Sequence, residues 1–103
     1  MAKQIKIKHW KNGMDVCVSI EPYITYVDHT KQESVQWILD SPHTSAFSIE
    51  FPHTSPFADD RKAFDHSSAT STHVKKKDQN EHKYNIMVDG ITIDPIIAVW
   101  PPG

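Results

Sequence analysis

The chain has 103 residues, of which 38% are hydrophobic and 23% are charged, and these values are typical of one soluble globular domain spanning residues 1–103. Eleven Lys and Arg residues against thirteen Asp and Glu residues give a formal net charge of -2, so we expect no attraction to nucleic acid or to an anionic membrane. The single cysteine, Cys17, excludes an intrachain disulfide and a zinc site made of thiolates.

The amino-terminal segment alternates charged residues with isoleucine, from Lys3 to Lys8, and lacks the unbroken apolar stretch of a secretory signal. We expect it to form a strand. The longest apolar run, Ile96 to Trp100, is too short to span a bilayer. The expected location is therefore the cytoplasm.

Apolar and polar residues alternate along most of the chain, the pattern of half-buried antiparallel strands. In chain order, the apolar positions are Ile5 and Ile7; Val16, Val18 and Ile20; Val35, Trp37 and Leu39; Phe47, Ile49 and Phe51; Tyr84, Ile86 and Val88; and Ile91, Ile93, Ile97 and Val99. Asp89-Gly90 between the last two runs predicts a tight hairpin. No segment has a helical period with caps. The chain is therefore expected to be all-β, a single antiparallel sandwich of about seven short strands with an immunoglobulin-like topology.

The segment 41–72 is rich in Ser, Thr, His, Pro and Asp, which predicts a long loop region with one strand inside it. Two similar hexapeptides in this segment begin at Pro42 and Pro52 and end at Phe47 and Phe57. Each is typical of a turn whose phenylalanine is anchored in the core. A functional loop over a site is the alternative.

Seven histidines raise the question of a metal site, but none stands in a spacing that would bring ligands together from one element. Folding would have to assemble such a site, and its ligands would be His53, His66, Asp59, Asp60 and Asp65. We therefore expect neither a metal nor another cofactor. Ser, His and Asp are abundant, but the chain has no Gly-x-Ser-x-Gly motif, so residue types alone say little about serine chemistry.

Asp94-Pro95 interrupts the strand-like run Ile91 to Trp100, because proline removes a ladder hydrogen bond and aspartate stands among isoleucines. An edge strand or a bulge with Asp94 facing solvent would explain the dipeptide. The chemical alternative is cleavage, since the Asp94 side chain can attack its own carbonyl carbon and expel the proline nitrogen. Burial among isoleucines would raise the pKa of Asp94 and supply the protonated carboxyl that favours this reaction. Another group could instead activate water, or an amine could attack.

Side-chain parity singles out one lysine of the segment 72–77. A strand that turns Val74 inward also turns Lys76 inward, while Lys75 and Lys77 face water. If Lys76 is buried, its pKa falls and its neutral amine becomes a nucleophile. The alternative is a solvated, charged strand end.

The block Tyr84 to Ile97 resembles the small bacterial DP-EP family, with Glu21-Pro22 similar to the Glu-Pro element and Asp94-Pro95 similar to the Asp-Pro element. The resemblance implies a β-sandwich endopeptidase that cleaves itself at the Asp94-Pro95 bond and assembles with itself. It also implies that a lysine amine can be joined to the freed aspartate, a role that Lys76 would fill.

The group that activates water is not singled out by the sequence, and Glu21, Asp89 and His73 are the candidates. Glu21 is equally explained as the end of a strand, and Asp89 as the first residue of the hairpin turn. The expected substrate is the protein's own chain, with a homo-oligomer possible through a linkage between Lys76 and Asp94. The rival hypothesis is a non-enzymatic β-sandwich binding or adhesion module that uses the His-rich loops around Phe57.

Overall fold

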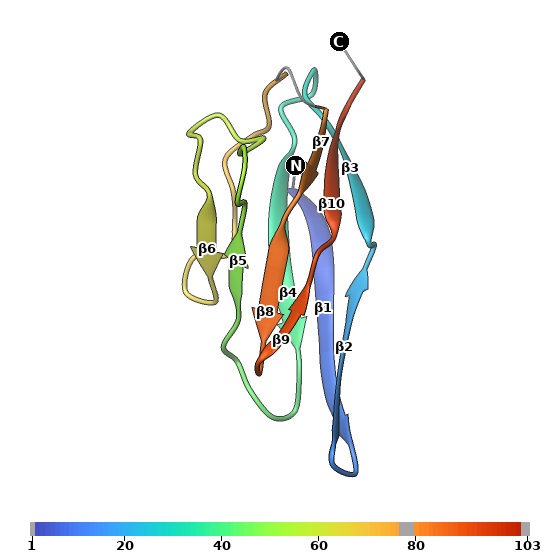
Figure 1. The fold of residues 1–103 in the computed structure, drawn as a ribbon. Helices are drawn as coiled ribbons and strands as arrows, with labels where there is room; N and C mark the ends of the chain where they lie inside the picture. Colours follow the sequence, from blue (N-terminus) through green and yellow to red (C-terminus); the bar gives the residue numbers. More distant parts are fainter. Residues whose placement is uncertain (1, 77–79, 102–103) are drawn as a thin grey trace.

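Strands make up the regular structure of the chain in a computed structural model that describes residues 2–76 and 80–101 (Figure 1). The described residues contain no helix, so none of them forms a helix able to cross a membrane. The strands are β1 (Ala2–Asn12), β2 (Asp15–Glu21), β3 (Ile24–Asp28), β4 (Ser34–Asp40), β5 (Ser48–Glu50), β6 (Ala63–Asp65), β7 (Glu81–Lys83), β8 (Asn85–Val88), β9 (Ile91–Ile93) and β10 (Ile96–Trp100). The predicted all-β class is confirmed.

Three small sheets run along the long axis of a molecule that measures 46 × 20 × 19 Å (Figure 1). Their strand orders are β2-β1-β4, β3-β10-β7 and β6-β5-β8-β9. The arrangement is β-sandwich-like, and the immunoglobulin-like topology stays a prediction. The expectation of antiparallel pairing throughout is wrong at two places, because β1 pairs with β4 and β3 pairs with β10 in parallel. Alternation reports which face of a strand is buried, and it carries no information on the direction of the neighbouring strand.

The described residues form ten strands, where the pattern predicts about seven. β3, β6 and β7 lie outside the predicted runs, and the last predicted run forms two strands, β9 and β10. β6 and β7 have three residues each, too few to show a period. In β3 the pattern misleads, because Ile24 and Tyr26 are exposed while Thr25 and Val27 are buried. This inverted pattern leaves two large apolar side chains on the outer face of the sheet.

Trp37 of β4 stands in the aromatic part of the core, where its ring lies 4.9 Å from that of Phe64 and 5.9 Å from that of Tyr84. Its indole Nε1–H donates to the Tyr84 hydroxyl at 3.2 Å. Phe47 and Phe57 are also buried. The interpretation of both hexapeptides as turns anchored by phenylalanine is therefore confirmed.

The predicted hairpin is present between β8 and β9. Asp89 and Gly90 have φ values of 50° and 77°, the pair of left-handed conformations that a two-residue turn between twisted antiparallel strands requires. Glycine adopts this conformation without strain, and aspartate tolerates it better than most residues. Asp89 is thus the first residue of the turn.

The apolar run at the carboxyl end forms two strands in different sheets. β9 pairs with β8, whereas β10 pairs with β3 and β7 (Figure 1). Asp94 and Pro95 join β9 to β10, so the chain crosses between the sheets there. This differs from the single strand with a bulge that the sequence predicts. Proline has no N–H to donate to a ladder, so the chain leaves one sheet where the ladder would lose a bond.

Candidate functional site

Three sheet-crossing segments meet at Asp94-Pro95. The chain passes from β2 to β3 through Tyr23 and from β7 to β8 through Tyr84. The amide of Ile96 donates to the Tyr23 carbonyl at 3.0 Å, and the amide of Tyr84 donates to the Pro95 carbonyl at 3.1 Å. Backbone hydrogen bonds therefore hold the Asp94-Pro95 peptide between two neighbouring segments.

The Tyr23 side chain lies directly on the peptide that the sequence predicts to be cleaved. Its hydroxyl donates to the Asp94 carbonyl oxygen at 2.7 Å and lies 3.4 Å from Asp94 Oδ1. Partial burial raises the pKa of the Tyr23 hydroxyl above its ordinary value, and the charge of Asp94 and the hydrogen bond to it act in the same direction. Tyr23 therefore remains a hydrogen-bond donor throughout the neutral pH range.

Sequence reasoning missed Tyr23, although it follows the quoted Glu21-Pro22 element immediately. The contact depends on the parallel register of β3 and β10, in which Ile24 lies opposite Ile96. That register brings Tyr23 beside the crossing. No periodicity in the sequence signals a parallel pairing between segments about seventy residues apart.

Asp94 itself is exposed to solvent, and the burial among isoleucines on which the cleavage interpretation relied is wrong. The neighbouring Ile93 and Ile96 belong to different sheets, so the strand that would have turned Asp94 toward the core ends before it. The solvent-facing alternative is the one observed. Pro95, in contrast, is buried. The apolar surroundings expected around the Asp94 carboxyl are therefore absent.

Lys76 is also exposed, which contradicts the parity prediction. Val74 is buried, as expected, but it makes only an isolated bridge with Phe57 and no strand continues through Lys76. Parity has no meaning once the extended ladder ends. Lys75 is exposed, as predicted, and Lys77 lies outside the described residues.

The backbone contacts place Lys76 far from Asp94. The amide of Val74 donates to the Glu33 carbonyl, and the amide of Glu33 donates to that of Asp28, the residue opposite Trp100 in the register of β3 and β10. This is the end of β10 farther from Asp94. Asp94 and Trp100 are six residues apart along extended chain, which corresponds to about 20 Å. This separation is beyond the reach of the Lys76 side chain.

Of the three candidates for water activation, Glu21 lies two residues before Tyr23, and its exposed carboxylate pairs with Lys8 Nζ at 3.5 Å. Asp89 lies at the far end of β9 from Asp94 and contacts His9 Nε2 at 3.2 Å. The His73 carbonyl accepts a hydrogen bond from the Ala58 amide. His73 directly precedes Val74 and belongs to the same segment as Lys76. The structure does not bring Asp89 or His73 to the crossing.

A metal site is not supported by the described part of the chain. No group of three His, Cys, Asp or Glu residues within it is placed to hold a metal ion. The alternative site made of His53, His66, Asp59, Asp60 and Asp65 is therefore wrong. The Asp65 carboxylate is instead occupied by Ser67, whose hydroxyl and amide donate to it and hold its pKa below the usual value.

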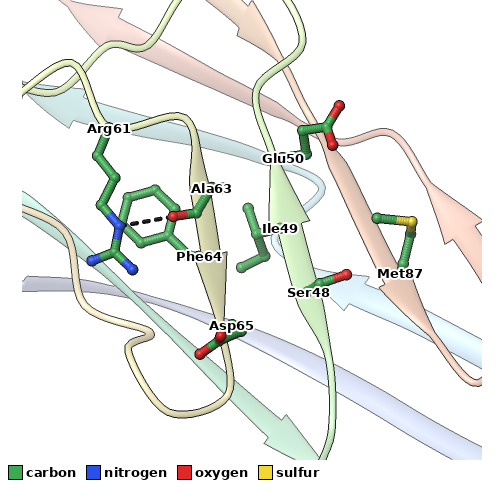
Figure 2. Close-up of a pocket in the computed structure, with 8 residues that line it drawn as sticks. All are labelled: Ser48, Ile49, Glu50, Arg61, Ala63, Phe64, Asp65 and Met87. Carbon is green, nitrogen blue, oxygen red and sulfur yellow. Dashed lines mark hydrogen bonds between the residues drawn. The ribbon is translucent and has the colours of Figure 1, made fainter.

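A hollow of about 360 Å³ is lined by residues of β5 and β6 together with Arg61 and Met87 (Figure 2). Figure 2 shows Arg61 at its side, with Nε donating to the Ala63 carbonyl at 2.7 Å. The guanidinium also lies over the Phe64 ring, 4.3 Å from the centroid, and donates to Ser68. Each of its three nitrogens thus donates within the protein, and the carboxylates of Glu50 and Asp65 line the same hollow.

Neither a family model nor a curated protein matches this chain, so the likeness to the DP-EP family stays an expectation.

Proposed function

We propose that the protein cleaves its own chain at the Asp94-Pro95 peptide bond. The observation that carries the proposal is the 2.7 Å hydrogen bond from the Tyr23 hydroxyl to the Asp94 carbonyl oxygen. Negative charge develops on that oxygen when its carbon is attacked. A donor that is already in place stabilises this charge without reorganisation at the moment of reaction.

The reaction begins at the Asp94 side chain. A carboxyl oxygen forms a bond to the carbonyl carbon of the same residue, and the oxyanion that results accepts the Tyr23 hydrogen bond. The carbon–nitrogen bond then breaks, and the Pro95 nitrogen leaves with its electron pair and takes the proton of the carboxylic acid. Water opens the cyclic anhydride, which leaves two carboxyl groups on Asp94 and a secondary amine on Pro95.

The exposure of Asp94 determines how the reaction responds to pH. An exposed carboxyl exchanges protons with solvent, and only its protonated form carries the proton that Pro95 needs. Cleavage is therefore expected to accelerate as the pH falls. The Tyr23 donor does not oppose this trend, because its raised pKa keeps it protonated from acidic to neutral pH.

Cleavage would leave the fold in place. β10 follows the cut and pairs with β3 on one side and β7 on the other. Ile97 and Val99 of β10 are buried in the core. Burial of apolar side chains contributes about 25 cal/mol per Å², so the cut segment stays bound and only denaturing conditions reveal it.

The distance between Lys76 and Asp94 favours water as the acyl acceptor within one molecule. Both side chains are exposed, so a Lys76-Asp94 bond would form between two molecules, with a second copy of the chain as the partner. The step exchanges the bond to Pro95 for a bond to the Lys76 amine, and the displaced proton passes to the Pro95 nitrogen.

The test is the intact mass of the chain under denaturing conditions, after incubation at acidic and neutral pH. We expect a fragment ending at Asp94, formed faster at the acidic pH. Tyr23→Phe should slow its formation roughly 10- to 100-fold, by removal of the oxyanion donor. Tyr26→Phe is the matched control, because Tyr26 is an exposed tyrosine of β3. Its substitution should leave the crossing unchanged. An uncut wild-type chain at every pH would contradict the proposal.

A binding module is the second candidate, favoured by exposed aromatic surface. Tyr26 of β3 and Trp100 of β10 are 61% and 53% exposed and line a hollow of about 230 Å³. The His-rich loops around Phe57 stay an alternative surface for this role, since Phe57 itself is buried but His43 and His53 of these loops are exposed. Binding would be favoured over cleavage if the wild-type chain stays uncut and the Trp100→Ala variant no longer binds the partner.

A further inference from the structure

His9 is a buried histidine, 2% exposed, that joins two distant parts of the chain. Its Nδ1 lies 2.6 Å from Ser41 Oγ, and its Nε2 lies 3.2 Å from Asp89 Oδ2. His9 belongs to β1, Ser41 follows the end of β4, and Asp89 begins the turn between β8 and β9. A serine, a histidine and an aspartate are thus aligned in hydrogen-bond contact, from three separate segments.

Hydrogen-bond chemistry fixes the direction of this chain of contacts. The Asp89 carboxylate can only accept, so Nε2 of His9 carries the hydrogen. With a neutral imidazole, Nδ1 then has a lone pair and accepts the Ser41 hydroxyl proton. The order, from serine hydroxyl to imidazole to carboxylate, is the one in which a histidine base activates a serine nucleophile.

Ser41 also borders open space. A hollow of about 490 Å³ is lined by Ser41 and Thr44 together with the apolar side chains of Leu39, Phe47 and Ala69. Ser41 is half-buried, whereas His9 is shielded from solvent. Gln36, Ser45, His66 and Thr70 also line the hollow, so its wall is of mixed polarity. Such a wall suits a small uncharged substrate that carries a polar carbonyl group and a short apolar chain.

Two backbone amides complete the surroundings of Ser41. Its Oγ accepts from the amide of His43 at 3.0 Å and from the amide of Thr44 at 3.3 Å. Attack on a substrate uses one of the Oγ lone pairs, so one amide must give up its bond. The longer bond, from Thr44, is the one that can pass to the carbonyl oxygen of a bound ester, where negative charge develops.

We propose that Ser41, His9 and Asp89 form a second acyl-transfer site, which takes small carboxylic esters. Ser41 Oγ bonds to the ester carbonyl carbon while its proton moves to His9 Nδ1. The carbon–oxygen bond of the ester then breaks, and the departing alcohol takes that proton. Water, deprotonated by His9, releases the acid and restores the serine.

This site is independent of the Asp94-Pro95 crossing. Asp89 and Asp94 lie at opposite ends of β9, and Asp89 faces His9. Substitution of Ser41 should leave self-cleavage unchanged, and substitution of Tyr23 should leave the Ser41 site unchanged. Failure of one proposal therefore says nothing about the other.

A fluorophosphonate probe tests the site on the full chain, because it bonds to an activated serine with loss of fluoride and is then located by peptide mass. We expect the label on Ser41, no label in Ser41→Ala, and labelling at least about tenfold slower in Asp89→Asn, which weakens the orientation of His9. Asparagine tolerates the left-handed conformation of the turn, so this variant should keep the fold. Hydrolysis of p-nitrophenyl acetate should fall in the same order.

Ser45→Ala is the matched control, since Ser45 lines the same hollow. It should label and hydrolyse like the wild type. The proposal is overturned if Ser41 remains unlabelled, or if Asp89→Asn labels as fast as the wild type. Either result would make Ser41 a structural residue that caps the turn through the His43 and Thr44 amides.

Discussion

The Tyr23 hydroxyl donates a 2.7 Å hydrogen bond to the carbonyl oxygen of Asp94, across 71 positions of sequence. The contact exists because β3 and β10 are parallel neighbours and the chain enters both strands at the same level. A phenol therefore lies on the carbonyl of the one Asp-Pro peptide in the chain. This pairing connects the sheet topology to the chemistry proposed for the bond.

Asp94→Asn should suppress cleavage while the fold stays intact. The amide is a far weaker nucleophile than the carboxyl, and its N–H protons are too weakly acidic to be given to the Pro95 nitrogen. Asp94 is exposed, so the free energy of unfolding should change by no more than about 0.5 kcal/mol. Denaturing mass spectrometry and urea unfolding measure the two effects. A fragment ending at residue 94 in this variant would exclude the side chain from the reaction.

Pro95→Ala should slow cleavage and also lower stability. Alanine leaves a secondary amide, whose nitrogen is a poorer leaving group. Pro95 is buried at the crossing, and its replacement frees the unfolded chain, which costs about 0.4–1 kcal/mol. The urea midpoint and the time course of fragment formation test both. Unchanged cleavage would mean that the leaving group does not limit the rate.

Alternation predicted much of β1, β2, β4 and β8, and the Asp89-Gly90 pair predicted the hairpin, because both signals are local. The sequence shows that Asp94-Pro95 is unusual within a strand, but it does not show that the chain passes from one sheet to another there. Whether β9 and β10 belong to one sheet depends on their partners, which alternation does not identify. Tyr23 was missed for the same reason.

The opposite error occurred at Lys76, where a local rule was extended beyond its range. Parity assigns faces only within a continuous strand, and the ladder near Val74 is a single bridge. His9, Ser41 and Asp89 were equally hidden, since 32 and 80 positions separate His9 from its partners. Constellations of this kind arise from folding and leave no spacing in the sequence.

The fragment from residue 1 to Asp94 should have its full hydrolysed mass. A direct attack by Lys76 of the same molecule would make it lighter by one water, and the separation of Lys76 from Asp94 argues against that product. A covalent dimer that grows with protein concentration would report the linkage between molecules. Lys76→Arg should abolish that dimer, and Lys75→Arg, its exposed neighbour, should not.

The free energy of unfolding should fall at alkaline pH because of Tyr84. Burial raises the pKa of its hydroxyl far above the ordinary value of 10.0, and the hydrogen bond from Trp37 offsets only part of this effect. The unfolded chain loses this proton above about pH 10, whereas the folded chain keeps it. Unfolding is then favoured by up to about 1.4 kcal/mol for each further pH unit, and the full stability is present below pH 10.

Urea unfolding of the wild type and of Tyr84→Phe between pH 8 and pH 11 separates this contribution from the other tyrosines. The variant should be less stable at pH 8 by about 1–3 kcal/mol, because the buried Trp37 Nε1–H loses its acceptor. Its stability should then decline less steeply above pH 10 than that of the wild type. Tyr26→Phe, at an exposed position, should follow the wild-type curve. Parallel curves for Tyr84→Phe and the wild type would show that Tyr84 ionises as readily in the folded chain as in the unfolded one.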